Sequence, residues 1–216
     1  MPAITKPAAR KIIDDFANEV REKRMPTVKP SKTVINFRTD VRDGIERQVW
    51  QVPIDILRFR KDNGRISSNV MDYEHKVGPL RETDVDAQIA IGKFLEEKDP
   101  ERTSVLRSSI VHDGQREPAI ITCDGFLING NRRKMVMDIL HKENPQDAAF
   151  KYMKCVILPG KEDINEGGPP TLVEIETLEN RYQLQGDGGP VGDQCAFRSA
   201  KQTRDGCGNA NLFVRA

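Results

Sequence analysis

The segment PAIITCDGFLINGNRR (residues 118–133) decides the fold of this 216-residue chain. Its first apolar run predicts a β-strand over 118–122, because short runs rich in β-branched residues favour strands. Asp124-Gly125 predicts a tight turn, since this pair is a strong hairpin signal. A second apolar run predicts the returning strand over 126–129. The segment is therefore expected to form an antiparallel hairpin.

Gly130 interrupts the second strand and precedes a helix. Apolar side chains then recur at helical spacing, which predicts a helix over 131–142. Its predicted inner face consists of Met135, Val136, Ile139 and Leu140. A helix start carries unpaired backbone N–H groups and a partial positive charge, and glycine lets a ligand approach the backbone closely. The turn is thus a candidate phosphate site.

Arg132 and Arg133 fall in the first turn of this helix. The helix dipole disfavours cations there by about 0.3–1 kcal/mol each. A bound phosphate would resolve the conflict, because arginine grips phosphate with two parallel hydrogen bonds. The alternative is that both side chains point into solvent or pair with nearby acids.

Two helices are predicted before the hairpin. Asp84 is a favourable N-cap for a helix that runs to about residue 97. Its predicted buried side chains are Ile89, Ile91, Phe94 and Leu95. Asp99-Pro100 predicts the start of the second helix, which runs to His112 before Gly114.

The N-terminal part is expected to be a helix over 7–24, followed by a linker over 25–32. Residues 33–38 and 46–56 then flank Asp43-Gly44, which predicts a second hairpin. The polar stretch 58–69 is expected to be an exposed arm or loop.

The C-terminal part contains a predicted strand over 152–158 and a helix over 172–184. The buried side of this helix is expected to hold Leu172, Ile175 and Leu178. Residues 185–216 are rich in Gly, Asp, Gln and Arg without periodicity, which is typical of an irregular or disordered tail.

Composition favours a globular protein, with 37% hydrophobic and 31% charged residues. A net charge of +1 indicates no particular partner. The start Met1-Pro2-Ala3-Ile4 lacks an apolar signal region, so we expect a cytoplasmic protein without membrane attachment. The four cysteines form no C-x-x-C pair and have no histidine at ligand spacing, which argues against a zinc site or a disulfide framework.

Several short motifs follow one another in a recognisable order. They are Val52-Pro53-Ile54-Asp55-Ile56-Leu57, Asn63-Gly64-Arg65, Ser108-Ser109-Ile110, Gly114-Gln115-Arg116-Glu117-Pro118, Gly130-Asn131-Arg132-Arg133 and Glu179-Asn180-Arg181. Each is weak alone, but their order over about 50–184 resembles the ParB N-terminal domain, whose fold is shared with sulfiredoxin.

The resemblance implies an α/β (α+β) fold: a small mixed sheet with flanking helices. It divides the chain into an N-terminal helix and linker (1–32), a ParB-like nucleotide-binding domain (33–184) and a tail (185–216). The domain carries an insertion relative to the family at about 68–105. This insertion is expected to form a lid or a surface for another protein.

The resemblance also implies the roles of site residues. The phosphates of a nucleoside triphosphate, CTP or ATP, would be bound by Arg65, Gln115, Arg116, Gly130, Asn131, Arg132 and Arg133. Glu179 and Asn180 would hold Mg²⁺, since a hard cation prefers oxygen ligands, and Glu179 is the candidate catalytic residue. Asn131 stands where ParB proteins usually have Glu and where sulfiredoxin has its reactive Cys, so sulfiredoxin chemistry is not expected.

The first functional hypothesis is a nucleotide-dependent switch or slow NTPase in a DNA-associated process. The second is a nuclease, with the metal on Glu179 and DNA phosphates on the arginines. A third is a non-catalytic module that docks DNA or protein, as a monomer or a homodimer. A fourth is a small-molecule kinase, for which the sequence offers no clear catalytic acid beyond the candidates Asp124 and Glu117.

Overall fold

The computed structural model describes residues 9–29, 31–35, 37–38 and 45–184. The predicted turn at Asp43-Gly44, the predicted tail 185–216 and the start of the predicted helix 7–24 lie outside these residues, wholly or in part. No helix in the described part of the chain is both long enough and apolar enough to span a membrane.

The centre of the molecule is a six-stranded mixed sheet, as the fold class predicted. The main path runs β1-β3-β6-β4-β5, with β2 paired to β3. The β4–β6 pair is parallel and the other pairs are antiparallel. The strands are β1 (Met25–Pro26), β2 (Lys32–Ile35), β3 (Ile45–Pro53), β4 (Ala119–Ile121), β5 (Leu127–Asn129) and β6 (Tyr152–Ile157).

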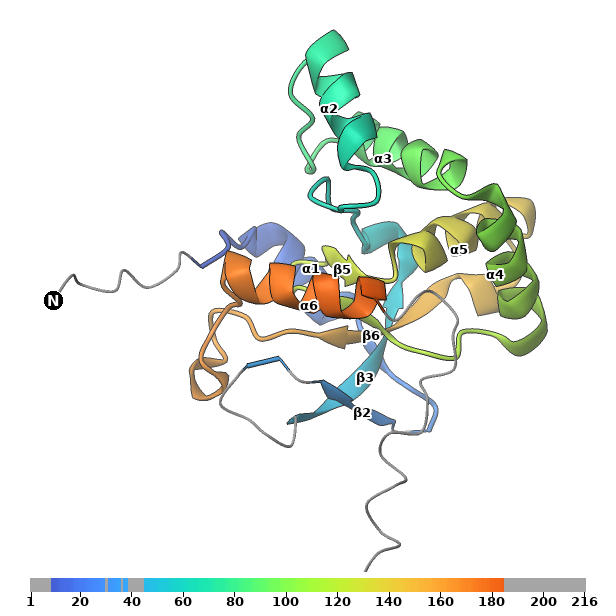
Figure 1. Cartoon of the computed structure of the whole chain (residues 1–216). Coiled ribbons are helices and arrows are strands. Elements are labelled where there is room, and N and C mark those ends of the chain that lie inside the picture. The colour runs from blue at the N-terminus through green and yellow to red at the C-terminus, as the bar shows by residue number, and fades with distance from the viewer. Residues whose placement is uncertain (1–8, 30, 36, 39–44, 185–216) are drawn as a thin grey trace, which may run out of the picture.

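Helices cover both faces of this sheet (Figure 1). They are α1 (Asp14–Lys23), α2 (Ser67–Lys76), α3 (Val85–Glu97), α4 (Pro100–Asp113), α5 (Asn131–Glu143) and α6 (Leu172–Leu184). Three short 3₁₀ turns are η1 (Ile54–Ile56), η2 (Ala148–Phe150) and η3 (Ile164–Glu166). The predicted helices 84–97, 100–112, 131–142 and 172–184 are confirmed to within a residue or two.

Alternation along the strands creates two cores. Met153 and Cys155 of β6 join the core that contains α3 and α5, whereas Val156 joins the core beneath α6. Successive strand residues point to opposite faces, so each strand serves both layers. The hairpin between β4 and β5 therefore lies between the two helical layers.

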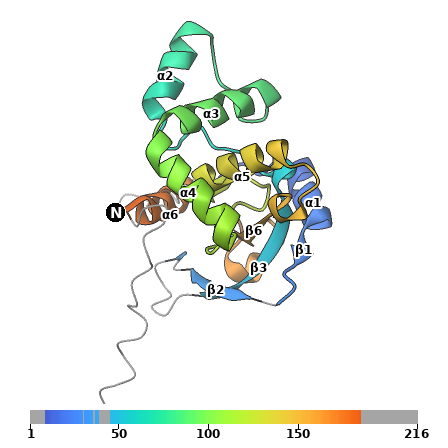
Figure 2. The ribbon, with the colours of Figure 1, turned by 90° about the vertical axis from the view of Figure 1, so that its right-hand side faces the viewer.

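The predicted insertion forms α2, α3 and the start of α4. Figures 1 and 2 show α2 and α3 at one end of the molecule, away from the sheet. Ile91 and Leu95 of α3 are buried, as predicted, and Phe94 packs against the core. Ile89 is 53% exposed, so its predicted burial is wrong. The prediction that Leu172 of α6 is buried is wrong in the same way.

The predicted helix 7–24 starts only at Asp14, because the residues before it are held extended. The Arg10 guanidinium donates to both carboxylate oxygens of Asp124 at 2.7 and 2.8 Å, and the Ile13 N–H donates to Oδ2 at 3.1 Å. Thr122 Oγ1 donates to Asp124 Oδ1 at 2.6 Å. Asp124 is fully buried, so this turn acid anchors the N-terminal segment.

Two other predictions for the N-terminal half are corrected. The predicted linker 25–32 contains β1, which pairs with Gln51 and Trp50 of β3. The predicted exposed arm 58–69 is partly buried, with Phe59, Arg60 and Ile66 each less than one-tenth exposed. Polar composition suggested exposure, but these residues pack between the sheet and the α2–α3 end of the molecule.

Candidate functional site

The candidate site begins at Gly130, between β5 and α5. Gly130 is left-handed with φ 95°, and a Cβ there would lie 2.9 Å from the Cβ of Ala119 and 3.2 Å from Cε of Met153. A side chain is therefore excluded both by backbone conformation and by space. The Lys134 N–H donates to the Gly130 carbonyl at 2.9 Å, which starts the helix.

A small hollow of about 20 Å³ lies at this turn. Its wall comes from four separate segments: residues 63–65, α3 with Leu95, the β5–α5 turn, and α6 with Glu179 and Tyr182. Five predicted site residues line it: Arg65, Gly130, Asn131, Arg132 and Glu179. A space of this size is close to that of one water molecule.

The start of α5 places two polar side chains in this wall. Arg132 is only 5% exposed, and its Nη2 lies 3.4 Å from Oδ2 of Asp99, the N-cap residue of α4. Asn131 is 8% exposed, and its Oδ1 is buried with no hydrogen-bond partner in the described part of the chain. Such an orphaned acceptor is uncommon in folded proteins and suggests an absent partner.

Glu179 closes the hollow from α6. Its carboxylate pairs with Nη1 of Arg60 at 3.2 Å and also accepts a hydrogen bond from the Gly64 backbone. Burial raises the pKa of Glu179, although the Arg60 charge opposes the shift. Sequence reasoning missed the role of Arg60 because it expected the stretch 58–69 to be an exposed arm or loop.

The remaining predicted phosphate ligands lie elsewhere. The Gln115 side chain hydrogen-bonds to the backbone of Lys154 in β6. Its Nε2 donates to the Lys154 carbonyl at 2.8 Å and its Oε1 accepts from the Lys154 N–H at 2.6 Å. Arg116 is 72% exposed and pairs with Asp113. Arg133 is buried and its Nη2 lies 4.0 Å from Glu117. The structure does not bring these three side chains into the wall of the hollow.

The predicted metal pair is also separated. Asn180 is exposed, whereas its neighbour Glu179 faces the hollow. No group of three or more His, Cys, Asp or Glu suited to a metal occurs among the described residues. The oxygens that fit Mg²⁺ here are the Glu179 carboxylate and the orphaned Asn131 Oδ1, because both are hard ligands in the same wall.

The described cysteines are poor nucleophiles. Burial, followed by the charge of Asp124, raises the pKa of Cys123 to about 11. Burial also raises the pKa of the fully buried Cys155 thiol. Since the thiolate is the reactive form, both groups favour a packing role.

No family model, curated protein or solved structure matches this chain significantly. The ParB-like resemblance therefore rests on the motifs and their order, and it stays a prediction.

Proposed function

We propose that this protein binds a nucleoside triphosphate with Mg²⁺ at the start of α5 and uses it as a switch in a DNA-associated process. The observation that carries the proposal is the convergence of Arg65, Arg132 and Glu179 on the Gly130 turn. These residues come from three distant parts of the chain, and each belongs to a motif of the family resemblance.

The phosphates would lie against the backbone N–H groups of the first turn of α5. Arg132 is nearly buried although the helix dipole opposes a cation there. Asp99 offsets part of its charge at 3.4 Å, which is longer than a strong charged hydrogen bond. An incoming phosphate therefore has a positively charged partner that is held in place before binding.

Glu179 and Asn131 would hold the magnesium ion, which neutralises phosphate charge when bound. Any hydrolysis, with water as the nucleophile, would follow from positioning and charge neutralisation by Arg65 and Arg132. This chemistry is consistent with slow turnover.

The size of the hollow suggests how nucleotide binding acts as a switch. About 20 Å³ is too small for a triphosphate, so the segment 60–66 would have to move outward from α6. That movement would loosen the Arg60–Glu179 pair and shift α2, which begins at Ser67. Nucleotide occupancy would thus be coupled to the position of the α2–α3 end of the molecule.

Calorimetry with CTP, ATP and GTP, each with Mg²⁺, tests the proposal. We expect saturable binding of at least one nucleotide, and we expect R132Q to weaken it by about 100-fold because it removes a buried phosphate contact. R107Q is the matched control, since Arg107 is an exposed arginine of α4 that pairs with Glu143. Absence of binding at millimolar nucleotide would overturn the proposal.

A further inference from the structure

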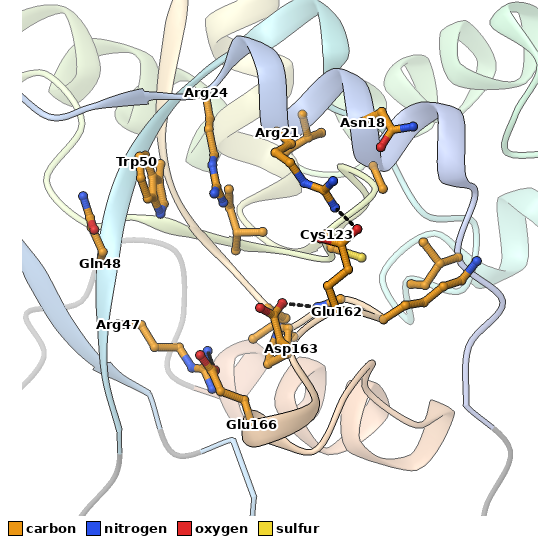
Figure 3. Close-up of a pocket in the computed structure, with 18 of the residues that line it drawn as sticks. Asn18, Arg21, Arg24, Arg47, Gln48, Trp50, Cys123, Glu162, Asp163 and Glu166 are labelled. Atoms are coloured by element: carbon orange, nitrogen blue, oxygen red, sulfur yellow. Dashed lines mark hydrogen bonds and ion pairs between the residues drawn. The ribbon is translucent and has the colours of Figure 1, made fainter.

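A second, much larger cleft lies at the opposite end of the β4–β5 hairpin. Its volume is about 670 Å³, and it opens between α1, β3 and the segment 157–166 (Figure 3). Cys123, in the hairpin turn, lines this cleft, whereas Gly130, after the second strand, lines the hollow. The two spaces therefore share no lining residue.

Arg24 stands out among the cations of the cleft. Its guanidinium lies over the Trp50 ring, 4.3 Å from the centroid, and makes no hydrogen bond or ion pair with any described residue. Burial, followed by the charge of Arg21, lowers the pKa of Arg24, and Asp163 opposes this shift. Figure 3 shows Arg24 beside Trp50, within the cleft.

The acids of the cleft are already engaged. Glu162 pairs with Arg21 at 3.0 Å, and Glu166 pairs with Nη1 of Arg47 at 2.6 Å. Asp163 accepts a hydrogen bond from the Gly160 N–H at 2.7 Å. Among the described residues, the half-buried Arg24 guanidinium thus has no direct ion pair, although the charge of Asp163 acts on it from a distance. A group in this position is stabilised by an anion.

Arg47 adds an independent observation on another wall of the cleft. Its side chain is 8% exposed, and its Nε and Nη2 are buried without hydrogen-bond partners in the described residues. Buried guanidinium nitrogens are normally satisfied. The acid that holds this group, Glu166, is itself 46% exposed and so is able to move.

The rest of the cleft suits an organic molecule rather than a free ion. Ile12, Val20, Ile157 and Leu158 give it apolar walls, and its volume lies within the range of small-molecule sites, roughly 300–1,000 Å³. The Arg21–Glu162 pair that bridges α1 and the 157–166 segment is well exposed on both sides. Exposed pairs contribute little stability, so a ligand would displace this contact at low cost.

We propose that this cleft binds a small organic molecule bearing one oxyanion, a carboxylate or a phosphate monoester, held by Arg24. The engaged acids around it disfavour a polyanion such as a triphosphate, because like charges repel at this range. The cleft is therefore a second ligand site, separate from the nucleotide site at α5.

Trp50 is the only tryptophan of the chain and provides a direct reporter. We expect benzoate or phenyl phosphate, added at constant ionic strength, to change its fluorescence saturably. Benzamide has nearly the shape of benzoate without its charge and is expected to bind at least about tenfold more weakly. Comparison of benzoate with phenyl phosphate identifies which oxyanion is preferred.

Arg24→Gln should reduce benzoate binding by at least about tenfold, and Arg24→Lys should restore part of it, because the charge is kept. Binding to both variants is followed by ligand-observed NMR, since the substitutions alter the fluorescence of Trp50 directly. Arg107→Gln is the distant control, and thermal unfolding confirms that each variant folds. R132Q should bind benzoate normally, which separates this site from the nucleotide site. Equal binding of benzamide and benzoate, or unchanged binding by Arg24→Gln, would refute the proposal.

Discussion

The hollow at α5 and the cleft at α1 are opposite kinds of space. The hollow has the motif residues and about 20 Å³ of room, whereas the cleft has about 670 Å³ and no recognisable motif. In the hollow, Arg132 and Glu179 face partners of opposite charge. Among the described residues, Arg24 in the cleft lies over an aromatic ring and makes no direct ion pair. Sequence motifs therefore point to the compact hollow as a candidate site, whereas a cation without a direct ion pair points to the open cleft.

Gly130→Ala should give the largest effect, because the core residues Ala119 and Met153 leave no room for a side chain at this turn. The left-handed backbone and a Cβ contact of 2.9 Å to Ala119 should together lower the free energy of unfolding by about 3 kcal/mol. Gly168→Ala is the matched control: its φ is 69° but no atom lies within 4 Å of the added Cβ. Urea unfolding should show a loss of only about 1 kcal/mol there. If both variants lost the same free energy of unfolding, the Cβ contact with Ala119 would not contribute to the effect at Gly130.

Arg60→Ala should have the next largest effect, because it removes a cation that pairs with the buried Glu179 carboxylate at 3.2 Å. We expect a loss of about 2–3 kcal/mol at neutral pH. Arg21→Ala, which breaks the exposed pair at the cleft, should lose less than about 1 kcal/mol. A loss at Arg21 as large as that at Arg60 would contradict the contrast between the two regions.

The Arg60→Ala effect should also depend on pH. Burial raises the pKa of Glu179, and removal of Arg60 raises it further. A raised pKa means that the native state binds this proton more readily than the unfolded chain, so stability falls as pH rises through the native pKa. The cost should therefore be larger at about pH 8 than at about pH 5, measured by urea unfolding. A cost independent of pH would show that Glu179 does not titrate in this range.

Glu174→Gln should have a small effect at the start of α6, the helix that carries Glu179. Glu174 accepts from the Thr171 N–H at 2.8 Å, and its own N–H donates to Thr171 Oγ1 at 3.2 Å. This is a capping box, which glutamine can also form. The substitution therefore removes only the negative charge and its ion pair with Arg38, and we expect a cost below about 1 kcal/mol at neutral pH. Glu176→Gln, on an exposed position of the same helix, serves as the control and should change little.

The Glu174 effect should vanish in acid. Burial alone would raise the pKa of Glu174, but hydrogen bonds from Thr171 and Arg38 outweigh it, and the pKa is lowered. The stabilisation is therefore present above the ordinary pKa and lost as pH falls through the native one. Thermal unfolding of the wild type and the variant should converge below about pH 4. A difference that persists there would have a cause other than the charge.

The predictable parts of this fold are those in which local signals suffice. The hairpin 118–129 and the helix after Gly130 follow from a turn pair, two apolar runs and one glycine. The Thr171-x-x-Glu174 capping box was equally readable but was missed. The extended course of residues 10–13 and the burial of Arg60 were not readable, because their partners Asp124 and Glu179 lie 114 and 119 residues away.

The residues of the candidate site also fall into those that the sequence predicted and those that it did not. Motif order grouped Arg65, Arg132 and Glu179, and these three residues line one hollow. It also assigned Gln115 and Arg116 to the same pocket, but their side chains contact Lys154 and Asp113 instead. Motif order reports which segments approach each other. The direction of a side chain depends on its rotamer and on competing partners such as the Lys154 backbone or Asp113.

The contact between Arg10 and Asp124 affects how the protein is produced for crystallography or NMR. An expression clone that starts at residue 33 would leave the buried Asp124 carboxylate without its Arg10 ion pair. It would also lack the edge strand β1 and one wall of the larger cleft. Such a fragment should accumulate in inclusion bodies. A clone that retains Arg10 should yield material that behaves as a single species on gel filtration.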